Sequence, residues 1–266
     1  MSIFKRLFVF IILGFVISFN ILAEEKKELL FYIGITMVKP MNELAQNFKK
    51  KCQCDIKILQ GGSQDLYESV KSSKKGDLYL AGSLSYRQKY LSEGFLLDGA
   101  FVGYNKVALV VAKGNPKQIP ADLSVLSDKN YRVVLGNVES GSIGDETKKV
   151  LMKFGNYEEA ILNTVYLVPD SRNLTKAIKD GEADVGLNWF ATTFWVDNNK
   201  FVEPLVINEK YAEKEILVLN LLKTSKYPEL TKEFIKYATS QEGRAIFHKY
   251  GFLDDNDLKN FDNIKF

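Results

Sequence analysis

The sequence predicts an α/β protein with two lobes, each a mainly parallel sheet flanked by helices. Short apolar runs alternate with amphipathic stretches of helical period, which is typical of strands that alternate with helices. Two long apolar runs, at residues 106–114 and 215–223, divide this alternation into blocks. They predict the places at which the chain passes from one lobe to the other and back, so that a two-strand hinge joins the lobes.

The first block predicts three strands and three helices in alternation. Its first helix carries Met41, Leu44 and Phe48 at the spacing of one helical face. Two helices near the end of the chain complete the fold, and a polar tail follows over residues 254–266. The strands are predicted at residues 28–35, 55–62 and 77–83, and the helices at 40–51, 63–73, 85–94, 228–240 and 241–252.

The second block predicts a smaller set of elements that forms the inserted lobe. Its strands are predicted at residues 106–114, 132–138, 163–170 and 183–189, and its helices at 144–155 and 173–182. We therefore assign residues 24–105 and 210–266 to lobe 1, and residues 106–209 to lobe 2.

The first 23 residues predict a secretory signal peptide. Lys5 and Arg6 precede a mostly apolar run, and Ala23 offers a small residue at the cleavage point. The run is short for a membrane-spanning helix, which needs about 20 apolar residues. No cysteine lies near the cleavage point, so we expect a periplasmic protein that is not lipid-anchored.

The charge balance argues against a nucleic-acid or membrane-surface ligand. Two of the 36 basic residues lie in the predicted signal peptide, which leaves 34 basic against 33 acidic residues in the mature chain. Proteins that bind nucleic acid carry a basic excess or a basic patch. We therefore expect no nucleic-acid partner and a monomer that binds a small molecule.

The residues that commonly carry catalysis or bind metal are few. His248 is the only histidine and lies in a predicted helix, where packing or exposure is the expected role. Cys52 and Cys54 form a CxC pair, free or locally bridged, without the nearby ligands of a metal site. No catalytic residue, cofactor or direct cation ligand is predicted, and an enzyme is a less favoured class.

Four strand-to-helix junctions carry the functional signal. Each has a small loop with hydroxyl or glycine residues before a helix, and helix N-termini offer unpaired N–H donors to an anion. Taken singly, each serine or threonine is more simply a helix cap. Together, with two from each lobe, they could face one another across a cleft. They are Thr36 in IGITMVKP, Ser63 in QGGSQD, Ser140 and Ser142 in ESGSIGDE, and Ser171 in VPDSRN.

Several of these segments resemble the molybdate-binding proteins of ABC importers, within the type II periplasmic-binding-protein superfamily. The resemblance covers nearly the whole mature chain and is clearest in GGSQDLYESV, LGNVESGSIG and DSRNLTKAIKDGEADVGLNW. FIKYATSQEGRAIFHKYGF is similar to the closing helices of the superfamily. The resemblance implies a type II periplasmic-binding-protein fold and a tetrahedral oxyanion, molybdate or tungstate, held between the lobes.

The resemblance also implies the binding residues and the partner. It implies hydroxyl donors at Thr36 and Ser63, a third loop at Ser142 and Ile143 with a backbone donor, and a backbone donor at Ser171. Trp189 stands where the family commonly has a tyrosine, and its indole N–H can only donate. Glycine replaces the family's alanine at Gly82. The partner would be an ABC permease in the inner membrane.

Other functions remain open at this stage. The ligand could be another small anion such as sulfate, phosphate or a phosphonate, or the protein could be a sensory binding protein that docks on a receptor. A ferric-iron-binding role is less favoured, because no adjacent tyrosine pair lies near the predicted site. Asp145, Asp170 and Asp184 lie near the loops and could repel a dianion, unless they cap helices or face solvent.

Overall fold

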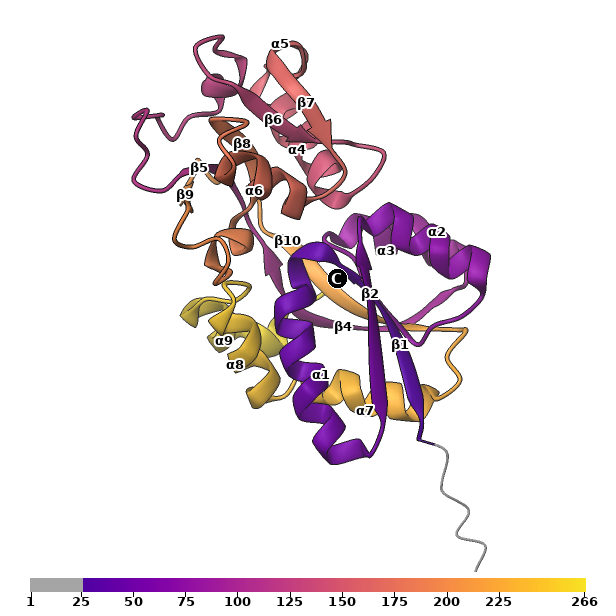
Figure 1. Cartoon of the computed structure of the whole chain (residues 1–266). Helices are drawn as coiled ribbons and strands as arrows, with labels where there is room; N and C mark the ends of the chain where they lie inside the picture. The colour runs from indigo at the N-terminus through magenta and orange to yellow at the C-terminus, as the bar shows by residue number, and fades with distance from the viewer. Residues whose placement is uncertain (1–25) are drawn as a thin grey trace, which may run out of the picture.

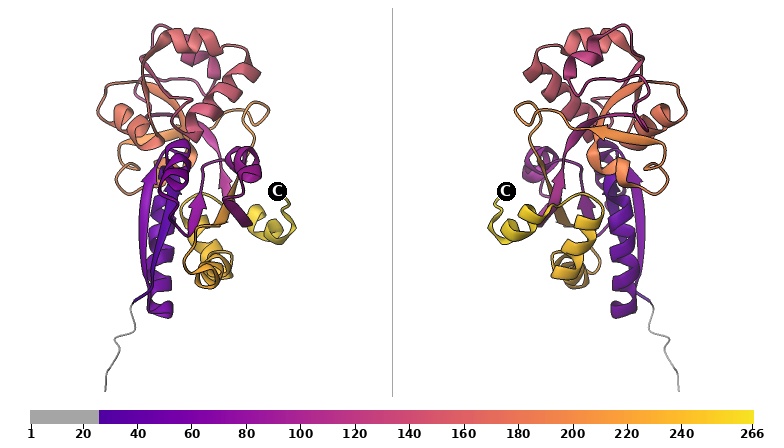
Figure 2. Two further views of the ribbon diagram at one scale, coloured as in Figure 1. Left: turned by 90° about the vertical axis from the view of Figure 1, so that its right-hand side faces the viewer. Right: turned by 90° about the vertical axis from the view of Figure 1, so that its left-hand side faces the viewer.

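The computed structural model describes residues 26–266, so the predicted signal peptide lies outside the described residues. The chain forms two lobes, each built on one five-stranded sheet (Figures 1 and 2). The first sheet has the order β2-β1-β3-β10-β4 and the second β7-β6-β8-β5-β9. The strands are β1 (Glu28–Gly34), β2 (Asp55–Gly61), β3 (Leu78–Leu80), β4 (Leu96–Asn105), β5 (Val107–Ala112), β6 (Val133–Gly136), β7 (Thr164–Val168), β8 (Val185–Trp189), β9 (Val202–Leu205) and β10 (Glu215–Leu222).

Helices cover both faces of each sheet. Within the described residues, six α-helices belong to the first lobe and three to the second, and Figure 1 shows how they are arranged. None of the helices between residues 26 and 266 is long and apolar enough to cross a membrane. The first group is α1 (Val38–Cys52), α2 (Ser63–Ser73), α3 (Leu84–Tyr90), α7 (Pro228–Ala238), α8 (Gln241–Lys249) and α9 (Asp255–Asn260), and the second is α4 (Ser142–Phe154), α5 (Tyr157–Asn163) and α6 (Ser171–Lys179).

Each sheet combines parallel and antiparallel pairs. β1 pairs in parallel with β2 and β3, and β6 pairs in parallel with β7 and β8. The strands that enter after a crossing, β10 and β5, pair antiparallel with their neighbours on both sides. The predicted α/β class is therefore confirmed, with mixed sheets in place of mainly parallel ones.

The chain crosses between the lobes twice. β4 ends at Asn105 in the first sheet and β5 begins at Val107 in the second, so Lys106 alone joins them. The return runs from the end of β9 to the start of β10, over residues 206–214. Asn105 pairs with Glu215, so the two crossings lie side by side.

The alternation of side chains along β1 explains how the first lobe is built. Phe31 and Ile33 face the cluster formed with α1, α7 and α8, and Phe31 lies 4.7 Å from Phe234, ring centroid to ring centroid. Tyr32 faces the opposite side and packs with Tyr79 in the cluster beneath α2 and α3. A strand buried on both faces gives the nearly continuous apolar run that the sequence shows.

The structure differs from the sequence prediction in the tail, in two helix starts and in three elements that were not predicted, β4, α5 and β9. The predicted polar tail forms α9 and a 3-10 turn, and Phe261 is buried 4.8 Å from Phe101, ring centroid to ring centroid. Residues 96–105, for which no element was predicted, form β4, in which Gly99, Gly103 and Asp98 interrupt the apolar pattern. The helices predicted from residues 144 and 173 begin at Ser142 and Ser171.

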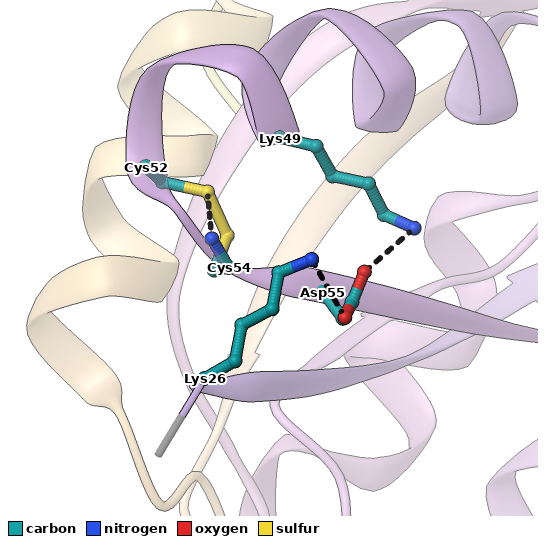
Figure 3. The surroundings of a disulfide bond; sticks show 5 residues. All are labelled: Lys26, Lys49, Cys52, Cys54 and Asp55. Atoms are coloured by element: carbon teal, nitrogen blue, oxygen red, sulfur yellow. Dashed lines mark hydrogen bonds and ion pairs between the residues drawn. A yellow bond between two sulfur atoms is a disulfide. The ribbon is translucent and has the colours of Figure 1, made fainter. Parts of the chain in front are cut away.

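The two cysteines form a local disulfide. Cys52 and Cys54 are bridged, with their Cα atoms 5.2 Å apart, at the end of α1 (Figure 3). Beside them, Lys26 and Lys49 pair with the Asp55 carboxylate at 2.9 and 3.3 Å and lower its pKa. These groups lie at the opposite end of α1 from the pocket described below.

Candidate functional site

The four predicted junctions meet at one pocket between the lobes. Its volume, with the open solvent at its mouth included, is about 220 Å³. α1, with the 3-10 turn before it (Ile35–Met37), and α2 approach from the first lobe, and α4 and α6 from the second. The side chains that line it and that the sequence predicted are Thr36, Ser63, Ser142, Ile143 and Ser171.

None of the four hydroxyl residues caps its own helix. The N-cap position is glycine at three of the four starts: Gly34, Gly62 and Gly141. At the fourth start Asp170 is the N-cap, and its carboxylate accepts from the Asn173 N–H at 2.9 Å. The hydroxyls therefore lie inside the first turn, where capping does not explain them.

The first turns of these helices leave backbone donors near the pocket. In α2 the first N–H bonded back to the N-cap carbonyl is that of Leu66, and in α6 it is that of Leu174. In α4, Gly144 N–H bonds to Gly141 O, so Ser142 and Ile143 precede the first bonded N–H. These unpaired N–H groups and the positive helix ends are the features that bind anions.

Two hydroxyls make contacts that orient them. Thr36 Oγ1 and Ser171 Oγ form a hydrogen bond of 2.8 Å across the lobes. Ser63 Oγ accepts from the Gly82 N–H at 3.0 Å, and Tyr79 donates to Ser63 O at 2.8 Å. A ligand oxygen that accepts from Thr36 and Ser171 would replace the bond between them.

Acidic side chains near the loops are engaged elsewhere. Asp170 is the only charged residue among the described residues that line the pocket, and it caps α6. Asp145 accepts from the Tyr86 hydroxyl at 3.1 Å. Burial alone would raise the pKa of Asp184, but hydrogen bonds from Arg132 and Lys117 lower it below its usual value. Neutral donors therefore dominate the pocket.

Trp189 is not brought to the pocket. Its side chain is buried in the core of the second lobe with Val107, Leu187 and Ile143. Successive strand residues face opposite sides, so its neighbour Asn188 faces α6 instead. The Asn188 amide donates to Ser171 O at 2.9 Å and to Thr175 Oγ1 at 2.8 Å.

Asn188 is a buried polar residue behind the pocket that the sequence did not single out. It is fully buried and bonds to the first turn of α6, so it holds the donors of that helix in place. The sequence did offer one indication of this residue, an asparagine within the apolar run VGLNW. A buried polar group needs hydrogen-bond partners, so such an asparagine is expected to hold a neighbouring segment in place. The closeness of Gly62 and Gly82 to the second lobe was also not predicted, because the sequence does not show which lobe surfaces touch.

Further contacts join the lobes around the pocket. Arg172 donates to Gln60 Oε1 at 2.9 Å, and Lys39 pairs with Asp197 at 3.0 Å. With the bond from Tyr86 to Asp145, they form a ring of contacts that exist only when the lobes are close. The ion pair between Lys39 and Asp197 is exposed and contributes little by itself.

Helix α4 also carries a buried carboxyl at the lobe contact. Glu146 is 4% exposed, and Lys149 lies between it and Glu215, at 3.2 and 3.4 Å from the two carboxylates. Glu215 also accepts from Ser83. Burial, together with the negative charge of Glu215, raises the pKa of Glu146 to about 7, although Lys149 opposes this shift.

Other chemistries find less support in the part of the chain that the structure describes. Within residues 26–266 no group of three or more His, Cys, Asp or Glu side chains could hold a metal ion. His248 lies at the end of α8, partly exposed, with Nε2 3.3 Å from Asp255. His248 is not among the described residues that line the pocket.

The sequence matches a known family over most of its length. The family model described as bacterial extracellular solute-binding protein matches residues 29–253. YvgL of Bacillus subtilis (strain 168), whose name describes an ABC transporter substrate-binding lipoprotein, is 23% identical over 236 residues, 86% of this chain and 88% of that protein. The molybdate-binding protein ModA of Rhodobacter capsulatus is 19% identical over 232 residues, 86% of this chain and 89% of that protein.

Solved structures share the fold. The sulfate-binding protein SubI of Mycobacterium tuberculosis H37Rv has a TM-score of 0.75 and 15% identity, and covers 89% of this chain and 91% of its own. The predicted type II periplasmic-binding-protein fold is confirmed by this likeness and by the two five-stranded sheets. These proteins are binding proteins, not enzymes, which agrees with the prediction of binding without catalysis.

Proposed function

The chain belongs to the bacterial extracellular solute-binding proteins, and from this membership we propose that it is the binding component of an ABC importer for a tetrahedral oxyanion. Molybdate or tungstate is the proposed ligand, held between the lobes by Thr36, Ser63, Ser142, Ile143 and Ser171. The observation that carries the proposal is the meeting of four helix starts, whose hydroxyls cap no helix, at one small pocket.

The donor set supports an anion in preference to a cation or a sugar. Hydroxyls and free N–H groups surround the pocket, and no lysine or arginine side chain lines its described part. Positive helix ends and neutral donors stabilise an anion without a formal countercharge. Withdrawal from water strengthens each of these interactions, because the effective dielectric constant falls. A small, fully ionised anion with acceptors in all directions suits this arrangement.

The choice of molybdate or tungstate rests on sequence likeness. The segments around Ser63, Ser142 and Ser171 resemble the molybdate-binding proteins, and ModA of Rhodobacter capsulatus is a relative over 86% of the chain. SubI, named for sulfate, has a similar fold, so sulfate is the first competitor in any test. Placing Trp189 in the core removes the indole from the proposed donors.

The mechanism we propose is closure around the ion without chemistry. The anion binds first to the donors of one lobe, and the second lobe then closes and completes the shell, as hinge proteins do around their ligands. Tyr86, Lys39 and Arg172 make their cross-lobe contacts only on closing. The closed form is what a membrane permease would recognise as loaded.

Ligand titrations of the mature protein test this function. Molybdate, tungstate, sulfate, phosphate, a phosphonate and ferric citrate are each added while the unfolding midpoint is measured. A ligand that binds only the folded state raises the midpoint once its concentration exceeds Kd. We expect the largest shifts with molybdate and tungstate. Shifts with sulfate or phosphate alone would replace the proposed ligand, and a shift with ferric citrate alone would replace the oxyanion class.

We also propose a periplasmic location after cleavage at Ala23. Mass spectrometry of the protein from a periplasmic fraction should then give Glu24 as the first residue. An acylated N-terminus, of the kind that the name of YvgL indicates for that relative, would contradict this proposal.

A further inference from the structure

Two glycines of the first lobe face the second lobe at the edge of the pocket. A Cβ atom added to Gly62 would lie 2.1 Å from Ser140 O and 3.0 Å from its carbonyl carbon. A Cβ atom added to Gly82 would lie 2.2 Å from Ser142 Oγ and 3.1 Å from Ser142 Cβ. Ordinary contact begins at 3.4 Å, so an alanine at either position would collide with the opposite lobe.

The backbone does not itself require glycine at these positions. Gly62 has φ −64° and ψ 145°, an extended conformation that any residue adopts. Gly82 is also absent from the glycines with positive φ. The only close neighbours that belong to the other lobe are Ser140 and Ser142. Within the first lobe, the nearest atoms to an added Cβ are the ends of two side chains, Asp65 Oδ2 at 3.2 Å from the Gly62 position and Asn105 Nδ2 at 3.4 Å from the Gly82 position. The Asp65 carboxylate needs to move by only a few tenths of an ångström, so alanine fits the first lobe when the lobes are apart and collides with the second lobe when they close.

We propose that Gly62 and Gly82 determine how far the lobes close, and thereby the smallest anion that the pocket holds tightly. Because Gly62 and Gly82 have no side chains, residues of the second lobe come into direct contact with the main chain of the first lobe at these two positions. An alanine at Gly62 would hold the lobes about 1.3 Å further apart, the difference between 2.1 Å and ordinary contact at 3.4 Å. The consequence for anion size rests on the proposed function, whereas the limit on closure does not.

The two positions differ in how strictly they limit closure. The group opposite Gly62 is backbone, which no side-chain rotation can move. The nearest atom opposite Gly82 is the Ser142 hydroxyl, which can rotate away, although the Ser142 Cβ remains close. Gly62→Ala is therefore expected to have the larger effect.

Gly61 provides a matched control in the same loop. A Cβ atom added there would meet only the Leu66 side chain of its own lobe, at 3.7 Å. Gly61→Ala thus adds the same methyl group one residue away without touching the second lobe. All three variants should keep the circular-dichroism spectrum of the parent protein.

Cross-linking of the unliganded protein tests the closure limit. Thr36 Oγ1 and Ser171 Oγ are 2.8 Å apart, so cysteines at these positions can form a disulfide when the lobes close. The rate with oxidised glutathione is measured for Thr36→Cys/Ser171→Cys alone and with each glycine variant, and the bond is identified by peptide mass spectrometry. We expect Gly62→Ala to slow the reaction at least tenfold, Gly82→Ala to slow it less, and Gly61→Ala to leave it unchanged.

Equal rates with Gly62 and with Gly62→Ala would overturn the proposal. Failure of the two cysteines to cross-link in the parent background would also overturn it, because the lobes would then not reach this contact. This measurement needs no ligand, so its outcome is independent of the proposed function.

Affinities for sulfate and for the larger molybdate test the consequence for selectivity. In Gly62→Ala the ratio of the two Kd values should move at least tenfold in favour of molybdate, and in Gly61→Ala it should not move. An unchanged ratio in Gly62→Ala would overturn the link to anion size. If the parent protein bound neither anion, the proposed function would fail, and the cross-linking rates would still decide the role of the glycines.

Discussion

Thr36 and Ser171, 135 residues apart in the sequence, share a hydrogen bond of 2.8 Å across the two lobes. One hydroxyl comes from the turn before α1 and the other from the first residue of α6. Both residues are almost fully buried. Closure therefore brings donors of both lobes within reach of a single small ion, which is the basis of the predictions that follow.

Ser142→Ala should weaken anion binding without loss of stability. Its hydroxyl lies at the pocket and caps no helix, and a hydrogen bond to a charged group contributes about 1.5–3 kcal/mol. At about 1.4 kcal/mol per factor of ten, the expected loss of affinity is about 10- to 100-fold, measured by calorimetry.

Ser240→Ala is the control for this serine. Ser240 is the N-cap of α8, and its hydroxyl accepts from the Gly243 N–H. Loss of a cap costs about 1 kcal/mol of stability, so this variant should unfold earlier and bind the anion normally. A stability loss in Ser142→Ala with unchanged affinity would contradict the assignment.

Tyr86→Phe should weaken ligand binding through the closed form. It removes the hydroxyl that donates to Asp145 across the lobes and keeps the buried ring. One such bond contributes about 0.5–1.5 kcal/mol, which predicts an affinity about 2- to 10-fold lower. In the matched variant Tyr67→Phe, which loses a bond to Glu93 within the first lobe, affinity should stay at the parent value. Equal losses in both variants would refute the cross-lobe explanation.

Glu146→Gln should make the protein more stable at alkaline pH. Burial beside Glu215 raises the pKa of Glu146 from 4.5 in the unfolded chain to about 7 in the folded one. Between pH 4.5 and 7 the folded protein therefore binds a proton at Glu146 that the unfolded chain has lost. The contribution of this proton to the free energy of unfolding is fully present below pH 4.5 and is lost as the pH rises through 7. Between these two pKa values the free energy of unfolding changes by roughly 3 kcal/mol.

Urea unfolding at pH 5, 6.5 and 8 measures this effect. The difference in unfolding free energy between Glu146→Gln and the parent protein should grow with pH, because other titrating groups cancel in the difference. Lys149 and Ser83, which contact the same carboxylate pair, are present in both proteins. A difference that did not change with pH would show that Glu146 stays ionised in the folded protein.

Trp189→Phe should lower stability and leave ligand affinity within about threefold of the parent value. Its side chain packs in the core of the second lobe, and reducing a large buried side chain costs stability through the cavity left behind. Asn188→Ala, in contrast, should weaken ligand binding. It removes the amide that donates to Ser171 O, and so loosens the first turn of α6. Titration of both variants with the same oxyanion separates the two roles. A strong loss of binding in Trp189→Phe would show that the indole takes part in ligand binding.

Local patterns were enough to predict most elements and the hydroxyl residues of the pocket. Apolar alternation identified eight of the ten strands, because strands buried on both faces are short continuous apolar runs. The junctions at Thr36, Ser63, Ser142 and Ser171 were visible because strand end, small loop and helix start follow one another in the chain. The strands β4 and β9 and the helices α5 and α9 were missed. Glycines in β4 and polar residues in α9 hide their buried side chains.

Only the tertiary structure decided which side chains meet across the lobes. Helix α6 packs on one face of β8, and the core of the second lobe packs on the other. Asn188 therefore contacts the first turn of α6, whereas Trp189 lies in the core. The contacts of Gly62 and Gly82 involve residues of the other lobe, whose distance is set by the hinge and not by any neighbour in the sequence. Periodicity reports which residues lie on one face of an element, whereas closure depends on the relative position of two separately folded cores.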